Sequence, residues 1–241
     1  MLPNFLICGI QKGGTTSLYH YLREHPDIFM PEVKEVNFFS INYEKGHLWY
    51  ERHFAACRGE QVVGEASPLY MWHPEVPQRI AGLIPSAKQV FVLRNPTERA
   101  YSNYWFNVSR GAQDPNQSFS EAIRTEDGRR RYITKGFYYE QIQRFLRFFG
   151  RDQLYVIINE DLRDNPLHQL SLCFEFLGVD RDFEPDTRRL HNPTLVPRNV
   201  LSRNLFRLWS PIRDRLFPLV PGVMRNVTKG FRVEIYRLFF V

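Results

Sequence analysis

The 241-residue sequence has little cysteine and no long uninterrupted apolar run. Its cysteines, Cys8, Cys57 and Cys173, lack the spacing of metal ligands or of disulfide pairs, so we expect plain core residues and no metal site. No segment approaches the roughly 18 apolar residues that a membrane-spanning helix needs. The first apolar run begins a few residues after Met1, which leaves no room for a signal peptide. These absences predict a cytoplasmic protein.

Composition and charge indicate the class of fold and the kinds of partner. Hydrophobic residues make up 43% of the chain and aromatic residues 15%, which favours a single globular domain over residues 1–241. The formal net charge is +6, and residues 198–241 hold nine Lys or Arg against two acidic residues. Such a basic stretch attracts polyanions. Its leucines at helical spacing suit either packing on the domain or peripheral contact with an anionic membrane.

Residues 5–18 combine a short apolar run, a Lys-Gly-Gly-Thr-Thr turn and the start of a helix. Backbone N–H groups at a helix N-terminus have no intrahelical acceptor and carry the positive end of the macrodipole, so they bind anions. A nucleoside-triphosphate P-loop has its lysine after the glycine, whereas Lys12 precedes the glycine pair. The pattern therefore predicts a phosphate loop of another kind, formed by Lys12, Gly13, Gly14, Thr15, Thr16 and Ser17.

The rest of the chain alternates apolar runs with helical periodicity. Strands are predicted at residues 61–64, 88–94 and 153–158, and helices at residues 15–24, 96–108, 137–149 and 167–177. This order predicts an α/β fold of three layers, P-loop-like, with a central parallel sheet flanked by helices. The polar stretch 109–135 is typical of a mobile loop or lid.

A second anion site is expected beside the first. Ligands of parallel α/β sheets bind outside the carboxyl ends of the strands, and Arg94 stands where a predicted strand ends. Ser102 follows two turns into the next helix. An arginine fork and a serine hydroxyl suit a phosphate group, although Arg94 could instead pair with an acid inside the fold.

These motifs resemble those of the sulfotransferases that use 3′-phosphoadenosine 5′-phosphosulfate (PAPS). Residues 11–18 are similar to the 5′-phosphosulfate loop of that family, and residues 92–102 to its 3′-phosphate motif. Residues 34–39, 43–50 and 64–70 resemble segments of the carbohydrate branch, the heparan-sulfate N- and 3-O-sulfotransferases and their bacterial relatives. Residues 136–139 and 174–178 extend the likeness to about residue 180, and residues 181–241 form a divergent or truncated basic part.

The resemblance implies a PAPS-dependent transferase that sulfates a hydroxyl or amino group, with adenosine 3′,5′-bisphosphate as the nucleotide product. It gives Glu35 the role of catalytic base and Lys12 that of neutralising the leaving phosphate. Arg94 and Ser102 would hold the 3′-phosphate. The expected partners are the nucleotide donor and a saccharide, glycolipid or small-molecule acceptor, with no nucleic acid.

Two other functions stay open at this point. A P-loop kinase would use residues 154–161 as a Walker B strand, and a polyanion binder would keep the fold without the activity. The second is suggested by Ala66, because many heparan-sulfate enzymes carry a lysine there; Lys34 or another basic residue could replace it. Glu65 either takes part in the site or serves the structure by accepting backbone donors.

Overall fold

The structure of this chain is a computed structural model that describes residues 1–188. The basic stretch and its expected C-terminal helix lie outside the described residues. The described part divides into two compact units, Met1–Arg99 with residues 135–188, and Ala100–Thr134. Its strands are β1 (Phe5–Ile7), β2 (Ile28–Phe29), β3 (Val62–Ala66), β4 (Lys88–Leu93) and β5 (Leu154–Ile158). Its α-helices are α1 (Thr15–Arg23), α2 (His47–Glu51), α3 (Leu69–Trp72), α4 (Val76–Leu83), α5 (Pro96–Ser109), α6 (Phe119–Ala122), α7 (Glu126–Gly128), α8 (Tyr138–Leu146), α9 (Asn159–Asp164) and α10 (Pro166–Leu177).

The five strands form one parallel sheet in the order β2-β3-β1-β4-β5. Strand β1 lies between β3 and β4, with Phe5 opposite Gly64 on one side and Lys88 on the other. This arrangement confirms the predicted α/β class and the parallel sheet. Strand β1 corresponds to the short apolar run predicted at the start of residues 5–18. Within residues 1–188 the two-residue β2 was not expected, because a strand so short leaves no periodic pattern.

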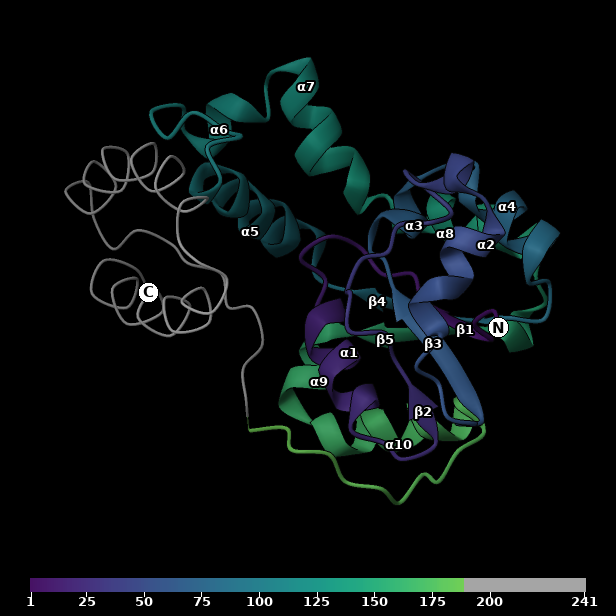
Figure 1. Ribbon diagram of the computed structural model, residues 1–241. Helices are drawn as coiled ribbons and strands as arrows, with labels where there is room; N and C mark the ends of the chain where they lie inside the picture. Colours follow the sequence, from purple (N-terminus) through teal and green to yellow (C-terminus); the bar gives the residue numbers. More distant parts are fainter. Residues whose placement is uncertain (189–241) are drawn as a thin grey trace, which may run out of the picture. The chain divides into compact units, whose positions relative to one another are not determined.

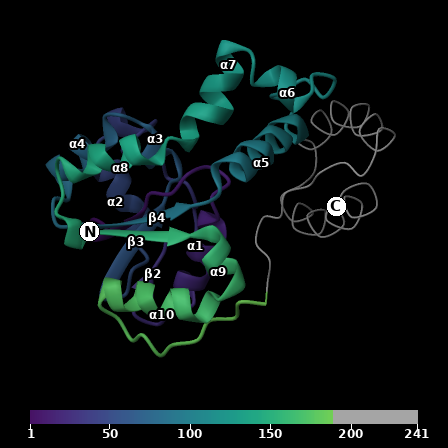
Figure 2. The ribbon, with the colours of Figure 1, turned by 180° about the vertical axis from the view of Figure 1, so that it is seen from behind.

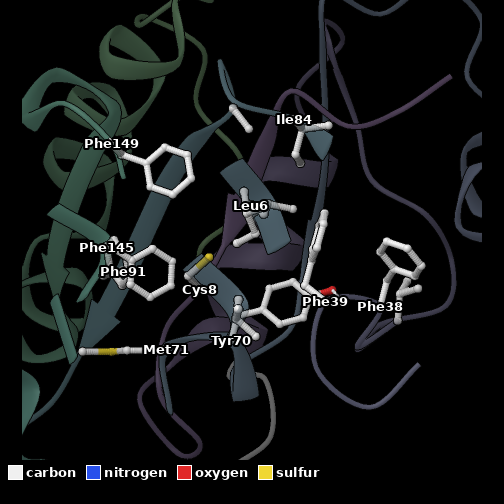
Figure 3. Packing of buried hydrophobic residues seen from close by; sticks show 14 of the residues in the cluster. Leu6, Cys8, Phe38, Phe39, Tyr70, Met71, Ile84, Phe91, Phe145 and Phe149 are labelled. Carbon is white, nitrogen blue, oxygen red and sulfur yellow. Dashed lines mark hydrogen bonds between the residues drawn. The ribbon is translucent and has the colours of Figure 1, made fainter. Parts of the chain in front are cut away.

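Alternate residues of the strands face two separate cores. Leu6, Cys8 and Phe91 belong to a cluster with side chains of α2, α3, α4 and α8, which Figure 3 shows from close by. Their sequence neighbours Ile7 and Val90 belong to a second cluster with side chains of α1, α9 and α10. The labelled helices lie on the corresponding sides of the sheet in both Figure 1 and Figure 2. The sheet is therefore the middle of three layers, because its period of two supplies an apolar residue to each face.

Helix boundaries follow local chemistry. The side-chain oxygen of Asn95 accepts the backbone N–H groups of Thr97 and Glu98 and so caps α5, which begins at Pro96. Helix α10 ends at Leu177, where the sequence predicted, and its C-cap Gly178 has a left-handed φ of 87°.

The stretch 109–135 is more ordered than the sequence suggested. Ser118 and Glu121 form a reciprocal capping box at the start of α6, and residues 129–133 form a short π-helix after α7. Within this unit Tyr104, Ala122 and Tyr132 are buried in a small apolar cluster of their own. The short helices of this stretch were not predicted because these widely spaced side chains give no helical period, and its action as a mobile loop or lid stays a prediction.

The cysteines are reduced, and two of them are core residues as expected. Cys8 is buried in the first cluster and Cys173 in the second, while Cys57 is partly buried. Burial raises the pKa of both buried thiols, that of Cys173 to about 12. Across residues 1–188, none of the helices has the length and apolar character required to cross a bilayer.

The first core predicts the effect of a matched pair of substitutions near α8. Phe145 is fully buried with its ring centroid 4.9 Å from that of Phe91, whereas Phe148 is 48% exposed. Phe145→Ala should lower the free energy of unfolding by about 3–5 kcal/mol, and Phe148→Ala by less than about 1 kcal/mol. Chemical denaturation of both variants measures the difference, and equal losses would contradict this assignment of the core.

Candidate active site

Residues 8–11 continue β1 along the end of β4 and lead into the phosphate loop, residues 12–17. The backbone N–H of Cys8 donates to the carbonyl of Val90 at 2.8 Å, and that of Ile10 to the carbonyl of Val92 at 3.4 Å. Gly13 packs on the same carbonyl, because a Cβ placed on it would lie 2.7 Å from the Val92 oxygen. The loop therefore packs on β4, and a side chain at position 13 would push the loop away from this strand.

The N-terminus of α1 has the features of an anion site. Helix α1 starts after Gly14, whose φ of 105° is left-handed, and the Asn159 side chain lies against this glycine. Within the described residues, α1 has no side-chain cap and its first turn has no acid. The first N–H groups and the helix dipole can thus act on an anion. Thr15 is buried, while Thr16 and Ser17 are partly exposed.

The turn that carries Glu35 is attached to the end of β3. The N–H of Glu35 donates to the carbonyl of Ala66 at 3.1 Å, and Lys34 Nζ lies 3.2 Å from Glu35 Oε1. The Glu35 side chain is 47% exposed, so its carboxylate remains accessible. Because β3 is the neighbour of β1, the structure brings Glu35 and the phosphate loop to adjacent strand ends.

Backbone strain is concentrated at the predicted catalytic residues. Among the described residues, the non-glycine positions with positive φ are Lys12 at 66°, Glu35 at 64° and Asn37 at 53°. Left-handed conformations of such residues cost of order 1–3 kcal/mol each and cluster at active sites. Lys12 and Glu35 were chosen from the sequence as catalytic residues, and the strain is an independent observation that favours the same pair.

The chain topology places a switch point between β1 and β3. From β1 the chain continues into α1 on one face of the sheet, and from β3 into α3 and α4 on the other. In open α/β sheets such a reversal is where ligands bind, at the carboxyl ends of the strands. Lys12 and Glu35 stand at the two sides of this point.

Arg94 follows β4 at the same edge of the sheet. Its carbonyl accepts the hydroxyl of Tyr138 at 2.9 Å, and its guanidinium forms an ion pair with Glu98 at 3.0 Å. The buried Nε of Arg94 has no hydrogen-bond partner in the part of the chain that the structure describes. Among residues 1–188 the acid that pairs with Arg94 is Glu98, whose side chain is half exposed, and the role of Arg94 in binding a phosphate stays a prediction. Ser102 is buried in α5 and belongs to the other unit, so its joint use with Arg94 stays a prediction.

Lys135 approaches the residue before Lys12 from a distant part of the chain, a proximity that sequence reasoning missed. Its Nζ lies 3.5 Å from Oε1 of Gln11, next to Lys12 in the chain. The carbonyl of Lys135 accepts the Gln141 side chain at 3.2 Å, which fixes the backbone from which this lysine extends. The available signal was its position just before residues 136–139, a segment that already resembled the family.

Glu65 differs from its expected role. It is fully buried and accepts hydroxyl donors from Tyr50, Ser67 and Tyr70 instead of backbone donors. Burial raises its pKa to about 7, against the lowering effect of these hydrogen bonds and of the Lys34 charge. Ala66 is buried at the end of β3, and the replacement of the lysine that many heparan-sulfate enzymes carry there by Lys34 or another basic residue stays a prediction.

A three-layer α/β protein with an uncapped helix N-terminus after its first strand belongs to the class of phosphate-binding folds. Residues 2–192 match the family described as Sulfotransferase domain. The chain therefore belongs to the sulfotransferase family, and the resemblance stated from the sequence is confirmed.

Relatives and solved structures agree with this membership. The chain is 36% identical over 197 residues to bifunctional heparan sulfate N-deacetylase/N-sulfotransferase 4 of Mus musculus, covering 74% of this chain and 22% of that protein. It is 31% identical over 182 residues to heparan sulfate glucosamine 3-O-sulfotransferase 6 of Mus musculus, covering 74% and 53%. The chain thus spans about a fifth to a half of the length of these relatives.

A bacterial sulfotransferase provides a structural comparison over nearly the whole chain. The crystal structure of the sulfotransferase from Alicyclobacillus acidocaldarius superposes with a TM-score of 0.72 at 35% identity, covering 91% of this chain and 96% of that one. A mouse sulfotransferase, SULT7A1, complexed with PAP shares the fold with a TM-score of 0.50 at 15% identity, covering 73% of this chain and 58% of that one.

The packing of the phosphate loop predicts the effect of one added methyl group. Gly13→Ala should weaken the binding of adenosine 3′,5′-bisphosphate at least about tenfold, since the loop must leave the Val92 carbonyl to admit a Cβ. Gly82→Ala is the control, because a Cβ there meets no atom within 4 Å. Isothermal titration calorimetry measures both, and unchanged binding by Gly13→Ala would show that the loop does not hold the nucleotide.

Proposed function

We propose that this chain transfers the sulfuryl group of PAPS to a hydroxyl or amino group of a saccharide or glycolipid. The observation that carries the proposal is the fixed placement of Glu35 and Lys12 at the ends of neighbouring strands, in a chain of the sulfotransferase family. The names of the relatives include both an N- and a 3-O-sulfotransferase of heparan sulfate, which supports a saccharide and leaves both nucleophiles open.

The residues of the site fit the donor nucleotide. Gly13 packs closely on β4, and α1 presents its first N–H groups without a side-chain cap among the described residues. Arg94 adds a guanidinium whose buried Nε lacks a partner within residues 1–188. We infer that the phosphate loop holds the 5′-phosphosulfate, while Arg94 and Ser102 hold the 3′-phosphate. When bound, PAPS supplies an activated sulfuryl group on a phosphate leaving group.

In the proposed reaction, Glu35 acts on the acceptor and Lys12 acts on the leaving phosphate, on opposite sides of the sulfur atom. Glu35 takes the proton of the acceptor as the new bond to sulfur forms, a contribution of roughly 10²–10⁴ in rate. Lys12 and the N–H groups of α1 neutralise the charge on the 5′-phosphate as its bond to sulfur breaks, each preorganised donor contributing about 10²–10³. Adenosine 3′,5′-bisphosphate and the sulfated acceptor are the products, so atoms and charge balance without a metal or redox partner.

The alternatives differ in the ligand that they require. Membership of the sulfotransferase family argues against the kinase, as does the order of Lys12 and the glycines. A non-catalytic binder would keep the nucleotide site and lose the acceptor reaction. The cytoplasmic location and a membrane contact of residues 198–241 stay predictions that depend on the sequence alone.

A thermal-shift comparison tests the nucleotide. Adenosine 3′,5′-bisphosphate at a hundredfold excess over its Kd should raise the Tm by about 5–10 °C, because binding to the native state alone stabilises it by about 2.7 kcal/mol. ATP with Mg²⁺ at the same concentration should give a smaller shift. A shift caused by ATP and Mg²⁺ alone would favour the kinase and contradict the proposal.

A pair of glutamates tests the base. Glu35→Gln should lower kcat for sulfation of a desulfated heparan pool about 10²–10⁴-fold, because the amide cannot take the proton. Its Kd for adenosine 3′,5′-bisphosphate should stay within about twofold. Glu32→Gln is the control, since the Glu32 side chain is 90% exposed and lies three positions before Glu35 in the same loop. Radiolabelled donor measures the rates, and equal turnover by both variants would remove Glu35 from the mechanism.

A further inference from the structure

Glu65 is a carboxylate inside an aromatic core. It lies opposite Leu6 in the register of β3 and β1, so it occupies the sheet face whose cluster includes Cys8, Tyr50 and Tyr70. It has no exposed surface. Buried charges are costly unless several hydrogen bonds compensate them, so a carboxylate kept at a position that suits an apolar side chain requires a reason beyond packing.

The hydroxyl groups that bind Glu65 also bind the turn that carries Glu35. Ser67 Oγ donates to Glu65 Oε2 at 2.6 Å and accepts the backbone N–H of Asn37 at 2.9 Å. Tyr70 donates its hydroxyl to Glu65 Oε1 and accepts the backbone N–H of Phe39 at 3.3 Å. Figure 3 shows Tyr70 and Phe39 as neighbours in the first core, and their ring centroids are 5.6 Å apart. Two hydrogen-bond relays therefore run from one turn to one carboxylate.

The ionised carboxylate determines the direction of both relays. A hydroxyl has one proton to donate, and an ionised carboxylate can only accept. Ser67 and Tyr70 must therefore direct their protons at Glu65, which leaves their lone pairs for the N–H groups of Asn37 and Phe39. Charge-assisted hydrogen bonds of this kind are about twice as strong as neutral ones.

The turn held in this way is strained. Glu35 and Asn37 both have positive φ, and such conformations persist only where the surrounding structure over-determines them. The bond from Glu35 N–H to the Ala66 carbonyl fixes one side of the turn, and the side chains of Asn37 and Asn42 bond carbonyls within it. The two relays add the bonds that connect the backbone of Asn37 and Phe39 to Glu65. Without the relays, relaxation of Asn37 would rotate the peptide that orients Glu35.

We infer that Glu65 is a positioning residue for Glu35: through Ser67 and Tyr70 it holds the strained turn that presents the catalytic carboxylate to the acceptor. This inference rests on the proposed sulfotransfer reaction and adds to it a residue that contacts neither donor nor acceptor.

Protonation of Glu65 should weaken this device. Burial raises the pKa of Glu65, whereas the hydroxyls of Tyr50, Ser67 and Tyr70 and the charge of Lys34 lower it. The effect of burial is the largest, so the pKa is raised to about 7. A protonated Glu65 carries an O–H that must donate to one of its hydroxyl partners, which disturbs that relay. Turnover should therefore rise with pH through the neutral range.

Stability should change in the opposite direction. Because the pKa of Glu65 in the folded chain lies above its value of about 4.3 in an unfolded chain, its contribution to stability is full below that lower value and is lost as pH rises through about 7. Glu65→Gln should therefore be at least as stable as the wild-type chain at pH 8 while turning over more slowly. A purely structural role for Glu65 would instead make both quantities fall together.

The variants that test the inference are matched in burial and in their contact with Glu65. Tyr50 and Tyr70 are both fully buried and both donate to Glu65 Oε1, but of these two hydroxyls the described contacts give only that of Tyr70 a backbone N–H of the turn as its donor. The Tyr50 ring contacts Phe38 and Phe39, and Tyr50→Phe keeps that ring while removing the hydroxyl. Tyr70→Phe and Ser67→Ala should lower kcat about tenfold with the Kd for adenosine 3′,5′-bisphosphate within twofold, whereas Tyr50→Phe should change kcat less than about threefold. Glu65→Gln should lower kcat about tenfold and remove the neutral inflection from its pH profile.

Amide hydrogen exchange provides a readout independent of turnover. Residues 34–39 should exchange faster in Ser67→Ala, Tyr70→Phe and Glu65→Gln than in Tyr50→Phe or the wild-type chain. Unchanged exchange in all of them, or equal kcat for Tyr50→Phe and Tyr70→Phe, would overturn the inference. If the wild-type chain sulfates no acceptor, the proposed function fails, and the exchange result still decides whether Glu65 holds the turn. If either Ser67→Ala or Tyr70→Phe fails to fold, as judged by the loss of its thermal unfolding transition, the other of these two variants takes its place in the comparison.

Discussion

The parallel pairing of β1 with β3 on one side and β4 on the other is the constraint on which the rest of this structure depends. Strand β1 has only three residues, yet its extension carries the phosphate loop onto the carbonyl of Val92. The turn of Glu35 is fixed to the end of β3 in the same way, through the carbonyl of Ala66. Both loops thus take their positions from the edge of a rigid sheet, which is how a site on loops can be held precisely.

Local patterns in the sequence were sufficient for the fold and for the position of the loop that follows the first strand. The glycine pair after an apolar run predicts an anion loop because a tight turn and an uncapped helix start are local properties. The runs at β4 and β5 predict strands of a parallel sheet for the same reason, and the structure confirms these two strands. The resemblance to sulfotransferases then identified Glu35, whose surroundings in a polar loop give no signal of their own.

The remaining contacts could not be predicted because they join residues far apart in the chain. Lys135 approaches Gln11 across 124 positions, and Asn159 packs against Gly14 across most of the domain. The roles of Ser67 and Tyr70 depend on the packing of three separate elements around Glu65. A single acid in the otherwise apolar strand Val62–Ala66 was the available signal, and it indicated that Glu65 was unusual without showing what it binds.

The two buried thiols have a practical consequence. Cys8 lies in the core on one side of the sheet and Cys173 in the core on the other, and burial keeps both in the poorly nucleophilic protonated form. An alkylating reagent can therefore modify either residue only when the helical layer above it opens. The chain carries its own pair of reporters, and mass spectrometry of the two labelled peptides would time the opening of each layer separately without any engineered label.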